Sequence, residues 1–416
     1  MDIRNTAFEI YMKSLDSARV GGSADELKGL SPQETAFVKR LVMTALRRQE
    51  FIKSVIRGYA AKKIPARPDA PHAAIILGAV EVLYFHTPDY ATVNSYVELA
   101  KKKGGKYAGG FVNAILRKIC RDRGQIAARP PLPFFPPAFK EMLRRDYSGR
   151  QIAAIEKAAV EEPALDITVR ADPEDWREKL GGRLMGSGSI RLNDAGSVAE
   201  LPGFKDGCWW VQDFSAALPV IALGSVEGRK VLDLCAAPGG KSFAAAMQME
   251  NTGSILSCDL HPHKIALIEK NAARLGISIL KAETRSAAEF DPALENGFDL
   301  VIADVPCSGL GVIRKKPDIR YKSPKELAQL PLIQRAILEN AASYVRPGGT
   351  LVYSTCTVLP EENEDVTGDF LDQHPEFEPV RTVFPLPVGP CPGQVTLWPQ
   401  RHGTDGFYIC RMRRKD

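Results

Sequence analysis

The stretch 231–242 constrains the fold of this chain more than any other. It reads Val-Leu-Asp-Leu-Cys-Ala-Ala-Pro-Gly-Gly-Lys-Ser, so a short apolar run leads into a Pro-Gly-Gly turn. The run 230–234 is typical of a buried parallel strand, and 243–249 is rich in helix-forming residues. Glycines let a backbone approach a ligand closely, and a following helix offers free N–H groups. Because ligands bind at the carboxyl edge of open α/β sheets, we predict a cofactor loop here.

Two common ligand loops do not fit this turn. A phosphate-binding P-loop also ends in Gly-Lys-Ser, but it needs a glycine five residues before Gly240, where Cys235 stands. A dinucleotide-binding loop needs Gly-x-Gly-x-x-Gly, which the turn does not supply. The remaining interpretation is a methyltransferase-like loop for S-adenosylmethionine, and the alternative is an ordinary strand-turn-helix without a ligand.

Length and composition permit several domains and set the cellular context that we expect. The chain has 416 residues, 44% of them hydrophobic, and a formal net charge of +5, which allows a nucleic-acid partner without requiring one. None of the eight cysteines forms a Cys-x-x-Cys pair, which argues against zinc knuckles and a secreted disulfide framework. No segment has the apolar length of a membrane span. We therefore expect a globular, cytoplasmic protein with no bound metal.

The first part of the chain, 1–128, is predicted to be a helical bundle. Ser31-Pro32-Gln33-Glu34 has the pattern of a capping box, and apolar residues recur at helical spacing after it. Basic residues gather late in this part and could either contact RNA phosphates or cap helix ends. These residues are Lys101, Lys102, Lys103, Lys106, Arg117, Lys118, Arg121 and Arg123.

A proline-rich stretch marks the expected boundary after the bundle. The stretch 129–137 holds five prolines, cannot continue a helix and is predicted to be a stiff linker. The pattern then favours a helix over 139–160, a strand over 164–170 and a short helix over 173–180. We assign 129–206 to this linker and a small α+β subdomain, and 207–416 to a third, α/β domain.

Chemically useful side chains follow the predicted strands of the third domain. The strands are expected at 230–234, 254–258, 277–280, 298–303 and 351–354, with antiparallel edge strands near the C-terminus. Asp259, Asp304, Cys307 and Cys356 come at or just past carboxyl ends, so they should converge on one crevice. Asp259 lies about twenty residues after the glycine turn, where an acidic side chain accepts ribose hydroxyls.

Other polar residues of this domain carry weaker predictions. Glu283 follows the third strand. His261 and His263 lack the spacing of a metal site and are expected at the surface. The basic residues of 314–322 could contact a polynucleotide or be solvated.

Two thiols and a carboxylate at one sheet edge suit methylation of a pyrimidine at C5. That carbon is a weak nucleophile until a thiolate adds to C6, after which loss of the C5 proton expels the enzyme. Asp304 can hold the N3 and exocyclic amine of cytosine as charge is redistributed, and the second cysteine can assist proton removal or release. A DNA methyltransferase would use Cys307 as the nucleophile, whereas Thr355-Cys356 on the last core strand argues against that class.

Three segments resemble the motifs of the RNA cytosine-C5 methyltransferases: 234–241, 304–309 and 354–363. Segments 77–84 and 110–117 resemble the NusB-type RNA-binding domain, and the whole chain is most similar to the bacterial members that act on 16S rRNA. The resemblance implies that Cys356 is the nucleophile and that Cys307 serves product release. It also implies cofactor contacts for Cys235, Ala236, Ala237, Pro238, Gly239, Gly240, Lys241, Asp259 and Asp304. Glu283 stands where the family usually places an aspartate against the adenine.

The resemblance completes the expected picture of the protein. The fold is expected to be multi-domain: an all-α NusB-like bundle, a small α+β subdomain and a Rossmann-like methyltransferase domain. The expected function is S-adenosylmethionine-dependent methylation of a cytosine C5 in 16S rRNA, through a covalent Cys–C6 adduct, by a monomer. The alternative is an RNA-binding assembly or antitermination factor whose sheet is vestigial. The target cytosine and the choice between free rRNA and a ribosomal particle stay open.

Overall fold

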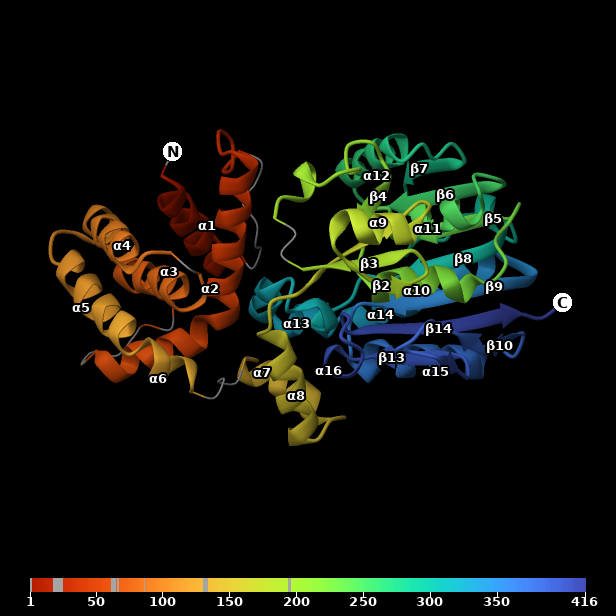
Figure 1. The fold of residues 1–416 in the computed structure, drawn as a ribbon. Coiled ribbons are helices and arrows are strands. Elements are labelled where there is room, and N and C mark those ends of the chain that lie inside the picture. The colour runs from red at the N-terminus through yellow and green to blue at the C-terminus, as the bar shows by residue number, and fades with distance from the viewer. Residues whose placement is uncertain are drawn as a thin grey trace. The chain divides into compact units, whose positions relative to one another are not determined.

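The computed structural model describes residues 2–17, 25–60, 65, 67–85, 87–129, 134–193 and 196–416 (Figure 1). The chain divides into two compact units. Unit 1 comprises Met1–Pro163 with Ile313–Lys322, and unit 2 comprises Ala164–Val312 with Ser323–Asp416. The predicted three-domain division stays a prediction, and the structure groups 129–163 with the bundle and 164–206 with the sheet. The predicted linker falls partly on residues 130–133, which lie outside the described residues.

Unit 1 is built from helices packed around an apolar core. The helices are α1 (Ile3–Ser17), α2 (Pro32–Tyr59), α3 (Ala70–Tyr84), α4 (Asp89–Gly104), α5 (Ala108–Arg121), α6 (Arg123–Ala127), α7 (Pro137–Arg144) and α8 (Gly149–Ala159). The predicted capping box of α2 is confirmed, because Glu34 N–H donates to Ser31 Oγ (3.2 Å) and Ser31 N–H donates to Glu34 Oε2 (2.8 Å). Helix α3 is apolar on most of its surface and lies in the core, which explains its near-continuous burial.

Several basic residues of the bundle already have partners within it. Lys101 pairs with Glu98, Lys103 with Glu9 and Arg123 with Asp89. The Lys118 ammonium lies 5.7 Å from the ring centroid of Tyr59. These contacts support a structural role for part of the basic cluster, and RNA contact by this cluster stays a prediction.

A segment from between two strands of unit 2 belongs to unit 1. Within Ile313–Lys322, the 3-10 helix η4 (Pro317–Tyr321) packs Tyr321 against the helical core. The carbonyl of Arg314 accepts a hydrogen bond from Arg47 (2.9 Å), and the Arg320 guanidinium lies 5.0 Å from the Phe134 ring. Arg314 and Arg320 are buried. The prediction that they are solvated or contact phosphates was therefore wrong for these two residues.

Unit 2 contains a small antiparallel sheet and a large mixed sheet. The small sheet has the order β2-β3-β1-β4 and is joined by helix α9 (Pro173–Leu180). Its strands are β1 (Leu165–Val169), β2 (Arg183–Gly186), β3 (Ser189–Leu192) and β4 (Trp209–Val211). The large sheet has the order β10-β14-β9-β8-β5-β6-β7, with β13 also paired to β14.

The large sheet is parallel at its centre and antiparallel at one edge, as predicted. Strands β9, β8, β5, β6 and β7 run parallel, whereas β14 pairs antiparallel with β9, β10 and β13. The strands are β5 (Lys230–Leu234), β6 (Ser254–Asp259), β7 (Leu280–Thr284), β8 (Phe298–Asp304), β9 (Val345–Thr355), β10 (Phe377–Pro379), β13 (Gln394–Leu397) and β14 (Phe407–Arg414). The short strands β11 (Thr382–Val383) and β12 (Pro390–Cys391) form a separate pair.

Helices cover both faces of the large sheet (Figure 1). Alternate residues of a strand point to opposite faces, so Val231 joins one core cluster and Leu232 joins the other. Helices α10 (Phe214–Leu223), α11 (Gly240–Gln248) and α12 (Pro262–Arg274) pack in the first cluster, and α14 (Leu330–Tyr344) and α15 (Glu364–Gln373) in the second. The short helices α13 (Pro324–Leu327) and α16 (Pro399–His402) complete the unit.

The predicted third strand was wrong in its bounds. Strand β7 begins at Leu280 rather than at Ile277, so Glu283 lies within the strand and not after it. Ile277 is buried in the core cluster that contains α12. Its apolar side chain therefore serves this packing and does not mark a strand. Strand β7 is at the sheet edge, and its exposed positions make its own pattern weak.

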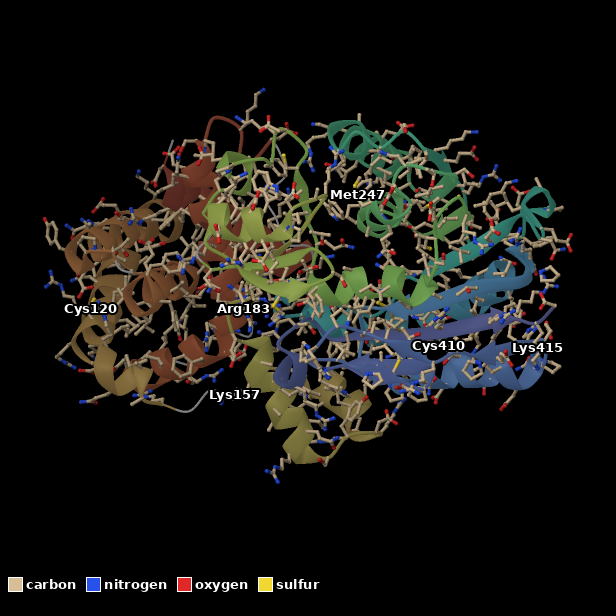
Figure 2. All side chains as sticks on the ribbon, turned by 45° about the vertical axis from the view of Figure 1, so that its right-hand side comes forward. Cys120, Lys157, Arg183, Met247, Cys410 and Lys415 are labelled. Atoms are coloured by element: carbon tan, nitrogen blue, oxygen red, sulfur yellow. The ribbon has the colours of Figure 1, made fainter. Side chains whose placement is uncertain are left out.

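Among the described residues, no helix combines the length and apolarity needed to cross a membrane. The same part of the chain contains no group of three or more histidine, cysteine, aspartate or glutamate side chains arranged for a metal ion. Cys120 lies on α5 of unit 1, and Cys410 lies on β14 of the large sheet of unit 2 (Figure 2).

Candidate active site

The turn between β5 and α11 has the backbone that its sequence predicts. Cys235 has φ 59° and Gly239 has φ 104°, both in the left-handed region. The turn is held by hydrogen bonds from Ala236 N–H to the Cys258 carbonyl and from Gly239 N–H to the Ala236 carbonyl, each 2.7 Å. A Cβ at Gly239 would lie 2.3 Å from the ring of Phe243, so only glycine fits there. The conformation of the loop therefore requires glycine at position 239.

The sequence analysis missed Asp233, a buried carboxylate that holds this loop to the sheet. Asp233 on β5 is fully buried and accepts a hydrogen bond of 2.5 Å from Ser242 Oγ. Ser242 Oγ also lies 2.7 Å from Ser257 Oγ on β6, so β5, β6 and α11 are joined. Burial raises the pKa of Asp233 to about 7. An acidic residue inside an otherwise apolar strand was the available signal.

Asp304 ends β8 and holds two partners from different elements. Its Oδ2 accepts from Lys241 Nζ (2.6 Å), and its Oδ1 accepts from Ser354 Oγ (2.7 Å). Lys241 is 9% exposed, and its ammonium lies 5.3 Å from the ring centroid of Phe407. The ion pair joins the glycine turn to the carboxyl end of β8, as the predicted convergence requires. Ser354 is a site residue that the sequence analysis did not single out.

The two predicted cysteines lie side by side. Cys307 follows β8 and Cys356 follows β9, and their sulfur atoms are 3.3 Å apart. The strands are neighbours in register, with Asp304 opposite Ser354. The hydrogen bond with Cys356 and burial both raise the pKa of the Cys307 thiol.

Burial also raises the pKa values of the other cysteines near the sheet. The pKa values of Cys235, Cys258 and Cys410 are each raised to about 12, and burial is the largest cause in each case. These thiols stay protonated at neutral pH and are poor nucleophiles. Cys235 can therefore contribute to the cofactor loop through its backbone and position, but not as a reactive thiolate.

Asp259 and Glu283 lie on the two neighbouring strands β6 and β7. Asp259 is 5% exposed, accepts from the backbone N–H of His261 (3.1 Å) and pairs with Lys264 (3.3 Å). Glu283 pairs with Lys281 (2.6 Å) and Arg285 (2.7 Å). Hydrogen bonds from these two residues lower the pKa of Glu283, and the bond from Lys281 has the larger effect. Glu283 is therefore an ionised carboxylate that already has two cationic partners.

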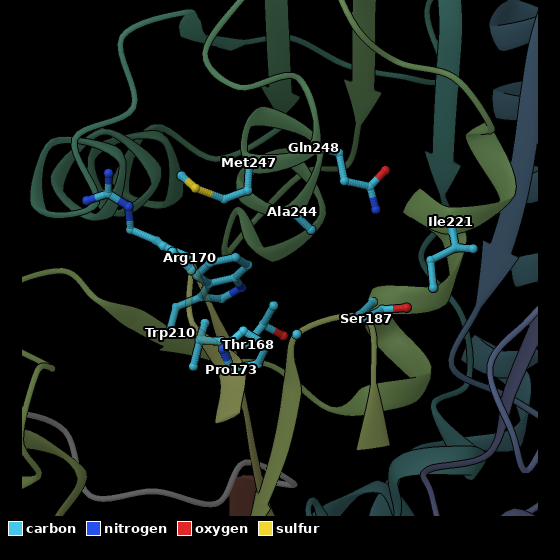
Figure 3. A pocket seen from close by; sticks show the side chains of 13 residues that line it. Thr168, Arg170, Pro173, Ser187, Trp210, Ile221, Ala244, Met247 and Gln248 are labelled. Atoms are coloured by element: carbon cyan, nitrogen blue, oxygen red, sulfur yellow. The ribbon is translucent and has the colours of Figure 1, made fainter. Parts of the chain in front are cut away.

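A cavity of about 290 Å³ lies elsewhere in unit 2, between the small sheet and helices α10 and α11 (Figure 3). Thr168, Trp210, Met247 and Gln248 contribute to its walls. None of the predicted site residues lines it.

This fold and site define a class. A parallel sheet with a glycine turn after β5, an acidic side chain ending β6 and a paired carboxylate ending β8 is the architecture of an S-adenosylmethionine-dependent methyltransferase. A family model described as 16S rRNA methyltransferase RsmB/F matches residues 220–413, and one described as NusB family matches residues 1–121. The chain belongs to the 16S rRNA methyltransferase RsmB/F family.

Relatives with similar names extend over nearly the whole chain. A Bacillus subtilis protein named "Probable ribosomal RNA small subunit methyltransferase B" is 34% identical over 93% of this chain and 92% of its own length. The Erwinia tasmaniensis "Ribosomal RNA small subunit methyltransferase B" is 28% identical over 92% of each chain. The crystal structure of PH0851 has a TM-score of 0.75 at 22% identity and covers 98% of both chains, which supports the fold.

These findings confirm the predicted family, with its NusB N-terminal domain, and the predicted fold class. They also confirm an rRNA methyltransferase that uses S-adenosylmethionine. The roles of individual residues stay predictions.

Proposed function

We propose that this protein methylates C5 of a cytosine in 16S rRNA through a covalent bond between Cys356 and C6 of the base. The observation that carries the proposal is the pair of thiols at the ends of β8 and β9, whose sulfur atoms are 3.3 Å apart. Asp304, on the same strand as the Cys307 loop, is ion-paired with the glycine turn. The two thiols and the glycine turn therefore lie at one sheet edge, which supports the proposal.

The proposed chemistry assigns one task to each residue. When bound, S-adenosylmethionine supplies an electrophilic methyl group. The Cys356 sulfur forms a bond to C6, and the ring electrons shift toward C5, which makes that carbon nucleophilic. Asp304 accepts a hydrogen bond from the exocyclic amine of cytosine and, when it carries a proton, donates one to N3, where negative charge develops. After transfer, the Cys307 thiolate accepts the C5 proton, the electron pair of the C5–H bond forms the C5–C6 double bond, and the bond between Cys356 and C6 breaks. Because both ring faces need access, the cytosine must be unstacked.

The conformation of the proposed cofactor turn depends on Gly239, because a Cβ there would lie 2.3 Å from the Phe243 ring. We expect Gly239→Ala to weaken S-adenosylmethionine binding by about tenfold or more, because alanine is strained at φ 104° and collides with Phe243. Isothermal titration calorimetry measures this affinity. Gly368→Ala is the matched control, because its Cβ meets nothing within 4 Å. Equal affinities for the two variants would contradict the proposed loop.

Asp259 and Glu283 are expected to contribute unequally to the same affinity. We expect Asp259→Asn to weaken S-adenosylmethionine binding about tenfold, because a buried carboxylate accepts two hydroxyls better than an amide does. Glu283→Gln should cost only about threefold, since Lys281 and Arg285 already pair with its carboxylate. Titration calorimetry of both variants compares them, and a larger loss for Glu283→Gln would reverse the assignment.

The proposed function is tested with the full-length protein and 16S rRNA transcribed without modifications. We expect S-adenosylmethionine-dependent formation of 5-methylcytosine, measured by mass spectrometry of the digested RNA. Methylation of another atom, or none on either free rRNA or ribosomal particles, would overturn the proposal. Bisulfite sequencing of rRNA from a strain lacking the protein then identifies the cytosine.

We further propose that the protein acts as a cytoplasmic monomer, with residues 1–128 as its RNA-binding part.

An RNA assembly factor with a vestigial sheet is the alternative. Such a protein would bind rRNA without heat of binding to S-adenosylmethionine. The intact ion pair between Lys241 and Asp304 and the paired thiols favour an active site over a vestigial one.

A further inference from the structure

Two consecutive buried polar residues lie beside the cysteine pair. Glu362 ends the 3-10 helix η5 (Pro360–Glu362) and is 1% exposed, and Asn363 is fully buried. Buried polar groups cost free energy unless they are hydrogen-bonded, so their partners indicate what they do.

Glu362 and Gln334 hold the loop that carries Cys307. Glu362 Oε2 accepts from the backbone N–H of Ser308 (2.8 Å) and from Gln334 Nε2 (2.8 Å). Gln334 Nε2 also donates to the carbonyl of Pro306 (3.0 Å). The backbone groups on both sides of Cys307 are therefore bound to one side-chain pair.

Asn363 holds the loop that carries Cys356 in the same way. Its Oδ1 accepts from Thr355 Oγ1 (2.6 Å), and its Nδ2 donates to the carbonyl of Thr357 (3.2 Å). Thr357 Oγ1 also lies 2.7 Å from Ser308 Oγ, which links the two cysteine loops directly. The residues before and after Cys356 are thus bound to Asn363.

We infer that Glu362 and Asn363 are positioning residues that set the two sulfur atoms against each other, Glu362 through the Cys307 loop and Asn363 through the Cys356 loop. This inference rests on the proposed function, in which the two cysteines act at different steps. A shift of about 1 Å in a reacting group can cost about 100-fold in rate. Each residue therefore controls a different step, although the two are adjacent in sequence.

The two losses should have opposite signatures. Without the Glu362 carboxylate, Cys307 is misplaced, proton removal slows, and the RNA adduct of Cys356 accumulates. Without the Asn363 amide, Cys356 is misplaced, the adduct forms slowly, and none accumulates. A merely structural role would slow adduct formation and release together, whereas positioning predicts slowed release alone for the Glu362 variant and slowed formation alone for the Asn363 variant.

The experiment follows adduct formation in a single turnover with unmodified 16S rRNA and S-adenosylmethionine, on denaturing gels. We expect Glu362→Ala to slow release about 10- to 100-fold and to accumulate adduct, and Asn363→Ala to slow formation by a similar factor. Glu362→Gln retains an acceptor oxygen and should restore release. Gln334→Ala removes the side-chain amide that donates to Glu362 and to the Pro306 carbonyl, so it should accumulate less adduct than Glu362→Ala. This variant tests the inference if Glu362→Ala does not fold.

Asp299→Ala is the matched control for loss of a buried carboxylate. Asp299 is 7% exposed and accepts from the backbone N–H of Lys230 (2.7 Å), near the opposite end of β8 from Asp304. It should accumulate no adduct. Loss of activity without adduct in both Glu362→Ala and Gln334→Ala would overturn the inference, provided that Cys307→Ala does accumulate adduct. Failure of Cys307→Ala to do so would instead contradict the proposed function.

Discussion

Replacing Cys356 by alanine is expected to abolish methyl transfer, with a loss of at least about 10⁴-fold, the scale seen when a nucleophile is removed. The reason is that C5 of cytosine stays a weak nucleophile unless a sulfur atom bonds to C6. Alanine removes that sulfur and leaves the neighbouring hydrogen bonds of Thr355 and Thr357 to Asn363 in place. Incorporation of a labelled methyl group into unmodified 16S rRNA measures the rate.

The control for this variant is Cys208→Ala, which removes a thiol outside the site. Cys208 precedes β4 in the small sheet and is only partly buried. Its replacement should leave methyl transfer within about twofold of the original rate. Retained S-adenosylmethionine binding by Cys356→Ala would show that the loss is chemical. Substantial methyl transfer by Cys356→Ala would exclude this cysteine as the nucleophile.

Replacing Cys307 by alanine is expected to trap the enzyme on its RNA. In the proposed function Cys356 is the attacking group, and Cys307 acts only after methyl transfer. Without it, Cys356 can still bond to C6 and the methyl group can transfer, but removal of the C5 proton slows. We expect multiple-turnover activity to fall about 100-fold or more. A protein–RNA species should accumulate toward one per enzyme, measured on a denaturing gel.

The double variant Cys307→Ala/Cys356→Ala separates this outcome from non-specific binding. It should form no denaturant-resistant species, because the sulfur that bonds to the base is gone. Accumulation in Cys356→Ala together with loss of the first step in Cys307→Ala would reverse the two roles. That pattern is the one expected of a DNA-type cysteine arrangement.

The local parts of the fold and site could be predicted from the sequence. The strand 230–234 and the glycine turn after it are present, because an apolar run, two glycines and a helix-forming segment have few alternatives. Asp259, Asp304, Cys307 and Cys356 lie at the predicted strand ends, since parallel strands bring their carboxyl ends to one edge.

Predictions were weaker where burial depended on distant partners. The edge strand β7 begins three residues later than predicted, because the apolar side chain of Ile277 packs in the core cluster with α12 and does not belong to a strand. Arg314 and Arg320 looked like solvent-exposed basic residues, yet their segment belongs to the helical unit. In both cases the residue types are evident from the sequence, but what these residues pack against is not.

By itself, the sequence determined which elements form and which chemical groups stand at their ends, because strand, turn and helix depend on residues a few positions apart. Only the tertiary structure decided how those groups are paired. Asp304 meets Ser354 across 50 residues and Ser308 meets Glu362 across 54. Such buried hydrogen bonds form where the fold excludes water and leaves a polar group no other partner, and no periodicity in the sequence encodes that choice.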